Sequence, residues 1–322
     1  MKKIYPIFLT GMFLLLFFLM LTYPAESLYY AFTGLTLWFQ KMIPTLFPFM
    51  ILSGIMIRMN LTEYFSMLLT PLFKPLFSVN GNGAYCIILG FLCGFPMGAK
   101  VVADLYERGK LSHEEASRLL AFCNNIGPIY MISFVLPLLG LTAKLPYLFG
   151  MYGIPLLYGV FLGHSSHRFA AERKRPIIRK AELKAASEVS VEKNSILAQI
   201  DASIMSGIEN ITRLGGYMIL FNLLNLFPAM LLPECALPYI NALLEITSGI
   251  SRMGSAMPLA VLLLLPFGGF SCIAQTYSII KNTDLSIGAY CLHKILLTLL
   301  TALFYGAWFG LCRLVPAVPF LP

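Results

Sequence analysis

Long stretches without a charged residue most limit what this chain can fold into. A charge at the centre of a bilayer costs about 2.5–3.5 kcal/mol, so stretches free of charge mark candidate membrane helices. Most of them are close to the roughly 20 apolar residues that a membrane-spanning helix needs. The stretches are 4–25, 42–57, 75–99, 119–143, 145–167, 214–233, 253–280 and 295–312. They predict an all-α polytopic membrane protein.

Composition supports this class and argues against others. Charged residues make up 12% of the chain, whereas a soluble domain carries about 25%. The net charge is +8, and half of it comes from the segment 168–193, where eight Lys or Arg face four acids. We therefore expect a basic cytoplasmic loop over 164–198, the lipid bilayer as a partner, and no nucleic-acid partner.

Motifs for catalysis or metal binding do not stand out. The sequence has no Walker loop, HExxH or GxSxG pattern, so we expect no enzyme activity and no cofactor. The seven cysteines and four histidines are scattered and form no CxxC pair, so we expect neither a disulfide framework nor a metal site.

Lys and Arg orient the predicted helices, because cytoplasmic loops are enriched in them. Lys2 and Lys3 place the N-terminus in the cytoplasm. We interpret 6–23 as an uncleaved first span and 64–78 as an interfacial helix. Counting from the first, the predicted spans are 6–23, 45–58, 122–140, 145–163, 214–232 and 287–311. Six crossings place both termini in the cytoplasm.

Two further windows are broken by Gly and Pro and predict re-entrant hairpins. The first, 83–99, is too short for two crossings and breaks at Gly94-Phe-Pro-Met-Gly98. The second, 253–280, breaks at Pro266-Phe-Gly-Gly-Phe270 and puts Asp284 on the outer face. The two hairpins then enter from opposite sides, which predicts an inverted repeat typical of secondary transporters. Close helix packing through small residues is the alternative.

Six residues at or near the first break are candidate substrate-binding residues: Gly94, Pro96, Gly98, Lys100, Asn124 and Asn125. Lys100 lies one turn into the helix that restarts after the break. It either contacts a ligand or pairs with Asp104 at i+4. Adjacent asparagines in an apolar window are costly unless satisfied, so Asn124 and Asn125 either cap a helix or contact a ligand.

The second half adds Glu245, Thr247, Ser271 and Gln275 to the candidates. Glu245 lies in a mostly apolar stretch and could bind a cation, a hydroxyl pair or a proton. The alternatives are that it meets water at the outer interface or pairs with Arg252. Ser271 and Gln275 are four residues apart, and either bind a ligand or cross-link helices.

Three motifs together resemble a known family. Gly94-Phe-Pro-Met-Gly-Ala-Lys100, Asn124-Asn-Ile-Gly-Pro128 and Glu245-Ile-Thr-Ser-Gly249 are similar to those of sporulation integral membrane proteins, which belong with the nucleoside-recognition, or Gate-domain, membrane proteins. The resemblance covers about 34–312. The family usually carries Tyr at Phe95 and Asn at Ser248. The resemblance implies a role in spore-envelope or cortex formation, but it supplies no substrate.

On this basis we expect four parts. They are an N-terminal transmembrane anchor (1–33), a first Gate-type repeat (34–163), the basic cytoplasmic loop (164–198) and a second Gate-type repeat (199–322). We expect a transporter-like protein that moves or binds a small polar solute or ion. The alternative is a membrane scaffold for spore-envelope proteins, and either could form a homo-oligomer.

Overall fold

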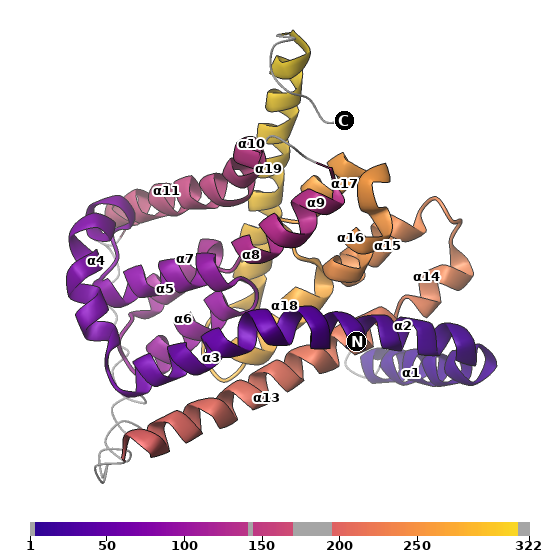
Figure 1. The fold of residues 1–322 in the computed structure, drawn as a ribbon, viewed down its shortest axis with the longest axis horizontal. Helices are drawn as coiled ribbons and strands as arrows, with labels where there is room; N and C mark the ends of the chain where they lie inside the picture. Colours follow the sequence, from indigo (N-terminus) through magenta and orange to yellow (C-terminus); the bar gives the residue numbers. More distant parts are fainter. Residues whose placement is uncertain (1–3, 141–143, 170–194, 315–322) are drawn as a thin grey trace.

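A computed structural model describes residues 4–140, 144–169 and 195–314, and every regular element in these ranges is helical (Figure 1). Six helical segments of this part are long and apolar enough to cross a membrane. They are Pro24–Arg58, His113–Leu138, Leu145–Ser165, Ile196–Leu231, Pro258–Ile280 and Ile287–Gly310. The predicted class, an all-α polytopic membrane protein with about six spanning helices, is confirmed.

The elements of the first half are α1 (Ile4–Thr22), α2 (Pro24–Leu37), η1 (Trp38–Met42), α3 (Ile43–Arg58), α4 (Thr62–Phe77), α5 (Gly81–Cys93), α6 (Met97–Glu107), α7 (His113–Cys123), α8 (Pro128–Tyr130), η2 (Met131–Val135), α9 (Leu136–Leu138), α10 (Lys144–Leu148), η3 (Phe149–Gly153) and α11 (Ile154–Phe169). Those of the second half are α13 (Ile196–Leu223), α14 (Leu226–Leu231), α15 (Leu237–Leu244), α16 (Ile246–Met253), η5 (Gly254–Ala256), α17 (Pro258–Leu264), α18 (Gly269–Ile280) and α19 (Ile287–Leu314).

The six spans differ from the predicted set in three places. The predicted span 6–23 corresponds to α1, whose apolar part, Leu9–Thr22, is one of the shorter helices and is not among the six. The predicted span 45–58 is the end of one helix that runs over Pro24–Arg58 through α2, η1 and α3. The predicted hairpin at 253–280 is wrong, because α17 and α18 together form the 23-residue candidate span Pro258–Ile280. Gly268 and Gly269 have φ values of 80° and 79°. They interrupt the helix, but the chain continues in the same direction.

The α5–α6 hairpin is present where the sequence placed it, and the second hairpin is α15–α16. At Glu245 the backbone is extended, with φ −138° and ψ 108°, and this ends α15. The two arms pack closely, because a Cβ on Gly249 would lie 2.2 Å from the Cα of Ala242.

The order of elements repeats along the chain. A long helix, a hairpin, a broken span and an unbroken span occur in the first half as α3, α5–α6, α7–α9 and α10–α11. They recur as α13, α15–α16, α17–α18 and α19. The opposite sense of the two repeats and the four domain boundaries remain predictions.

One end of the molecule is rich in polar contacts. Lys110 Nζ donates hydrogen bonds to Asn60 and Glu63, each at 2.8 Å. Tyr106 Oη donates to Asp284 Oδ1 at 2.7 Å. Burial and this hydrogen bond raise the pKa of Tyr106 to about 12, so the phenol remains a donor at neutral pH. Asp284 therefore lies at the same end as Lys110, and its predicted place on the opposite face is wrong.

The opposite end is reached by α13, which runs antiparallel to the long helix of the first half. A Cβ on Gly54 would lie 3.2 Å from Ser203, and one on Gly34 would lie 2.9 Å from Met218. The start of α13 is thus near Arg58 at the polar end, and Cys235 follows its far end. Cys235 is exposed.

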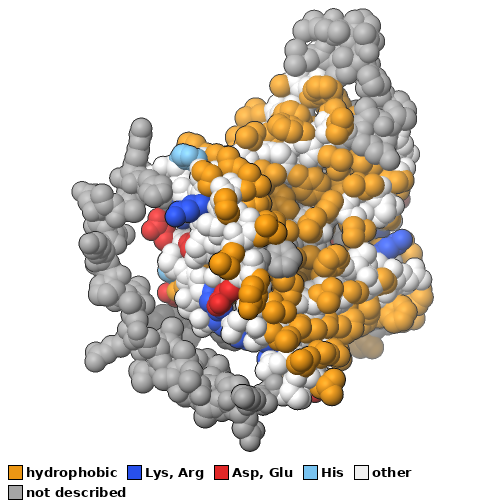
Figure 2. Space-filling model, turned by 60° about the vertical axis from the view of Figure 1, so that its left-hand side comes forward, with side chains coloured by type: hydrophobic (Ala, Val, Ile, Leu, Met, Phe, Trp, Pro, Cys, Tyr) orange, Lys and Arg blue, Asp and Glu red, His pale blue; other side chains and the backbone are white. Residues whose placement is uncertain are grey.

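Apolar side chains cover much of the outer surface. Leu21, Leu145 and Leu231 are 83%, 80% and 79% exposed. In Figure 2 hydrophobic side chains cover most of the visible face, and most of the charged ones gather toward one end. This distribution suits lipid contact around the helices and water at the polar end.

The placement of Asp284 gives a prediction about accessibility. In a cysteine-depleted background, Arg108→Cys and Lys281→Cys should be labelled by a membrane-impermeant maleimide from the same face. Native Cys235, restored alone, should be labelled from the other face. Labelling in intact cells and in inverted vesicles checks this. Labelling of positions 281 and 235 from one common face would contradict the arrangement.

Candidate functional site

The tip of the α5–α6 hairpin packs directly against the break in the next span. A Cβ on Gly90 or Gly98 would lie 2.3 Å or 2.5 Å from the carbonyl oxygen of Cys123. Gly94 has φ +88°, and a Cβ there would lie 2.4 Å from the amide nitrogen of Gly127. These glycines serve close backbone packing, as the alternative interpretation of the sequence held. That packing also fixes the position of the tip.

The same tip reaches the break of the second half. Phe95 follows Gly94 at the turn and is 9% exposed. A Cβ on Gly268 would lie 2.8 Å from its ring carbon Cζ. The breaks near Pro96 and Gly268 therefore meet inside the protein.

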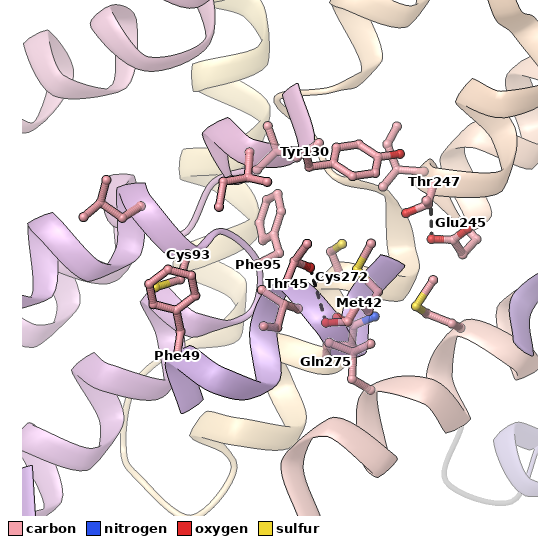
Figure 3. Close-up of a pocket in the computed structure, with 18 residues that line it drawn as sticks. Met42, Thr45, Phe49, Cys93, Phe95, Tyr130, Glu245, Thr247, Cys272 and Gln275 are labelled. Atoms are coloured by element: carbon pink, nitrogen blue, oxygen red, sulfur yellow. Dashed lines mark hydrogen bonds between the residues drawn. The ribbon is translucent and has the colours of Figure 1, made fainter. Parts of the chain in front are cut away.

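A cavity lies where these breaks converge (Figure 3). The space open to the centre of a water-sized sphere is about 60 Å³, enough for a few waters or a small solute. Its lining comes from both halves: Met42, Thr45, Leu46, Phe49, Leu92, Cys93, Phe95, Ile126, Gly127, Ile129, Tyr130, Leu214, Met218, Glu245, Ile246, Thr247, Cys272 and Gln275. The lining is mainly apolar with a few polar groups, which is typical of small-molecule sites.

Glu245 forms one wall of the cavity and caps α16. Its Oε1 accepts a hydrogen bond from the Thr247 amide at 3.2 Å, and its Oε2 accepts one from the Ser248 amide at 2.7 Å. The side chain is 2% exposed, so it does not meet bulk water as one interpretation held. The predicted pairing with Arg252 is also wrong, since that guanidinium lies over the ring of Tyr30 at 4.7 Å.

Lys294 contacts Phe95 and is fully buried. Its Nζ is 4.5 Å from the centre of the Phe95 ring and donates to Asn125 Oδ1 at 2.9 Å. No carboxylate lies within 4.0 Å of this ammonium among the described residues. Buried cations are costly without an anionic partner, and within membrane segments they usually have a functional role.

Asn124 and Asn125 connect the two halves at this point. The Asn124 side chain donates to Thr276 at 3.0 Å and to Tyr290 at 3.1 Å, and accepts from the Ala99 amide at 3.3 Å. Asn125 accepts from Lys294. The two side chains thus bind α6, α18 and α19 together at the break of the α7–α9 span.

Two of the remaining candidates make contacts within their own helices. Lys100 Nζ is 2.7 Å from Asp104, so it makes the i+4 pair that the sequence offered. Gln275 donates to Ser271 Oγ at 3.0 Å. A smaller second cavity adjoins the first, and Pro96, Lys100, Asn210, Arg213 and Gln275 are among its lining residues. Gln275 and Leu214 line both cavities.

The structure thus brings three of the ten candidates, Glu245, Thr247 and Gln275, to the main cavity. The binding role of all ten stays a prediction. The sequence did not single out Phe95 and Tyr130, which line the cavity, or Lys294, which contacts Phe95. Lys294 had a readable signal, because it is the one Lys or Arg within 287–311.

Comparisons with known proteins agree with this architecture. The family model described as "Gate: Nucleoside recognition" matches residues 39–223. The chain is 25% identical to the sporulation integral membrane protein YlbJ of Bacillus subtilis (strain 168), with 96% of this chain and 86% of that protein aligned. No solved structure matches.

The packing of the first tip predicts a stability effect. Gly98→Ala places a methyl group against the Cys123 carbonyl, so we expect a loss of about 1–3 kcal/mol, as for other overpacked sites. Gly216→Ala is the matched control, because no heavy atom lies within 4 Å of its added Cβ. Thermal unfolding in detergent measures both. Equal unfolding midpoints for the two variants would contradict the packing argument.

Proposed function

Because this chain belongs to the nucleoside-recognition Gate family, we propose that it binds a small polar solute or ion in the central cavity and moves it across the membrane during sporulation. The observation that carries this proposal is the cavity itself. It lies where a hairpin tip and helix breaks from both halves meet, and such interrupted elements form the binding sites of secondary transporters.

The groups around the cavity favour a polar occupant. Glu245, Thr247 and Gln275 supply hydrogen-bonding groups, and Figure 3 shows Tyr130 extending toward Thr247. The Tyr130 hydroxyl is buried beside Thr247. Lys294 is not part of the lining, but its ammonium lies 4.5 Å from the centre of the Phe95 ring, which is, so a rotation of that ring would bring a positive charge closer to the cavity.

The second cavity suggests the route by which a solute enters. It adjoins the first at Leu214 and Gln275 and is lined by Lys100 and Arg213 on the way to the polar end. We propose that Leu214 and Gln275 form the constriction between entry path and binding site.

The polar end is proposed to face the cytoplasm. The basic segment 170–194 joins the end of α11 to the start of α13, and the start of α13 is at that end. Positive charge in short loops favours the cytoplasmic side. Since α19 runs away from Asp284, its end at Leu314 is then on the outer side, in contrast to the expectation that the span 287–311 runs inward. The C-terminal residues 315–322 lie outside the described residues. The N-terminus stays cytoplasmic if α1 crosses the membrane.

The biological setting is proposed from the relative. That protein is named for sporulation and aligns with nearly the whole of this chain. The family description names nucleoside recognition, so nucleosides belong in any ligand screen beside amino acids, small carboxylates and inorganic ions.

Two matched pairs of variants test the proposal. A thermal-shift screen of those ligand classes, followed by uptake of radiolabelled hits into proteoliposomes, gives the reference. Glu245→Gln and Lys294→Met should lower uptake at least tenfold. Glu209→Gln and Lys281→Met remove an exposed carboxylate and an exposed ammonium, and should leave uptake unchanged. No ligand response in folded protein, together with cross-linking of partner proteins through 164–198, would favour the scaffold alternative.

Lys294→Met has a second expected result. Methionine has similar length and carries no charge, so removal of a buried ammonium without a carboxylate partner should leave the unfolding midpoint equal or higher. A variant that is at least as stable but inactive identifies a functional rather than a structural lysine. A midpoint lowered by several degrees would instead show that Lys294 holds the fold together.

A further inference from the structure

Three buried asparagines near Glu245 have side-chain oxygens that accept no hydrogen bond from the described residues. Asn222 and Asn225 are 0% exposed and Asn241 is 3% exposed. In each of them the Oδ1 atom is buried and without a donor. Buried oxygens are normally satisfied by protein, water or an ion, so three unsatisfied ones in one region need an explanation.

The three asparagines and Glu245 lie on neighbouring helix ends. Asn225 follows Asn222 by one turn, and its backbone N–H donates to the backbone carbonyl of Asn222 at 3.0 Å. Asn241 precedes Glu245 by one turn, and the Glu245 amide donates to its carbonyl at 2.8 Å. The Asn222 amide group lies 3.5 Å from Glu245 Oε2, which joins the two pairs.

The charge of this cluster is not balanced by the protein. No Lys, Arg or His nitrogen lies within 4.0 Å of the Glu245 carboxylate among the described residues. Three cations of this half contact other groups: the Arg252 guanidinium lies over the Tyr30 ring, Arg213 pairs with Glu209, and Lys294 lies over the Phe95 ring. An ionised carboxylate in a membrane interior is costly unless a positive charge compensates it.

We propose that Asn222, Asn225, Asn241 and Glu245 form a binding site for an alkali-metal cation. Carboxylate and amide oxygens are the ligands that hard cations prefer. One carboxylate neutralises a monovalent ion, whereas a divalent ion would leave a net positive charge in an apolar region. Because Glu245 also lines the central cavity, the cation lies beside the solute site. Its role as a coupling ion rests on the proposed function, but cation binding itself does not.

The test uses the full-length protein in detergent. Unfolding midpoints are measured in NaCl, KCl and choline chloride at equal ionic strength, and binding of radioactive Na⁺ is measured on the same preparations. Na⁺ or K⁺ should raise the wild-type midpoint saturably by several degrees relative to choline. Asn225→Leu and Asn241→Leu should raise the half-saturating concentration at least tenfold, and Glu245→Gln should abolish the response.

Asn282→Leu is the control, because Asn282 is exposed in the turn after α18 and lines neither of the two cavities, and it should respond like wild type. Equal wild-type midpoints in all three salts would overturn the proposal. So would a response to Ca²⁺ or Mg²⁺ alone, or stabilisation by acid alone, which would indicate a neutral carboxyl group. A protein that binds the cation but transports nothing would refute only the proposed function.

Discussion

Lipid offers no hydrogen-bond partner to a free backbone N–H or C=O group, so every helix break in a membrane protein has to be buried in protein or line a wet cavity. This requirement organises the present fold. The breaks at 94–96, 124–127, 245 and 265–268 come from distant parts of the chain, and their residues are almost all buried. They pack against one another around one cavity. Long helices on the outside, such as Pro24–Arg58 and α13, separate them from lipid.

Much of this architecture could be predicted from the sequence, because absence of charge and the Gly-Pro interruptions report directly on membrane helices and their breaks. The α5–α6 hairpin lies where Gly94 and Pro96 indicated. The second hairpin was misplaced because Pro266 and the glycines after it have the same local signal, although there the helix restarts in the same direction. The contact between Tyr106 and Asp284, which are 178 residues apart, reveals that direction.

At the candidate site, too, local sequence patterns identified polar residues but not their contacts with distant parts of the chain. Glu245 and the two asparagines were noticed because polar residues in apolar windows are expensive. What each one touches depends on the partner helix, which no local pattern encodes. The sequence offered Arg252 to Glu245 by proximity along the chain. Instead, Glu245 caps α16 by accepting from the Thr247 and Ser248 amides, and tertiary packing adds Asn222. Lys294 was not singled out because it directly precedes the charge-free stretch 295–312. A lysine at the end of such a stretch usually reaches the lipid interface.

The course of α19 has a further consequence. This helix belongs to the second half of the sequence, yet its side chains contact the first half along its length. Lys294 binds Asn125, and Tyr305 donates to the Tyr147 carbonyl and packs against Gly150. The two halves therefore exchange a helix and share one interior. Separately produced halves would each expose a polar or aromatic surface meant for the other. Such a protein assembles and fails as a unit, even though the order of its elements repeats along the chain.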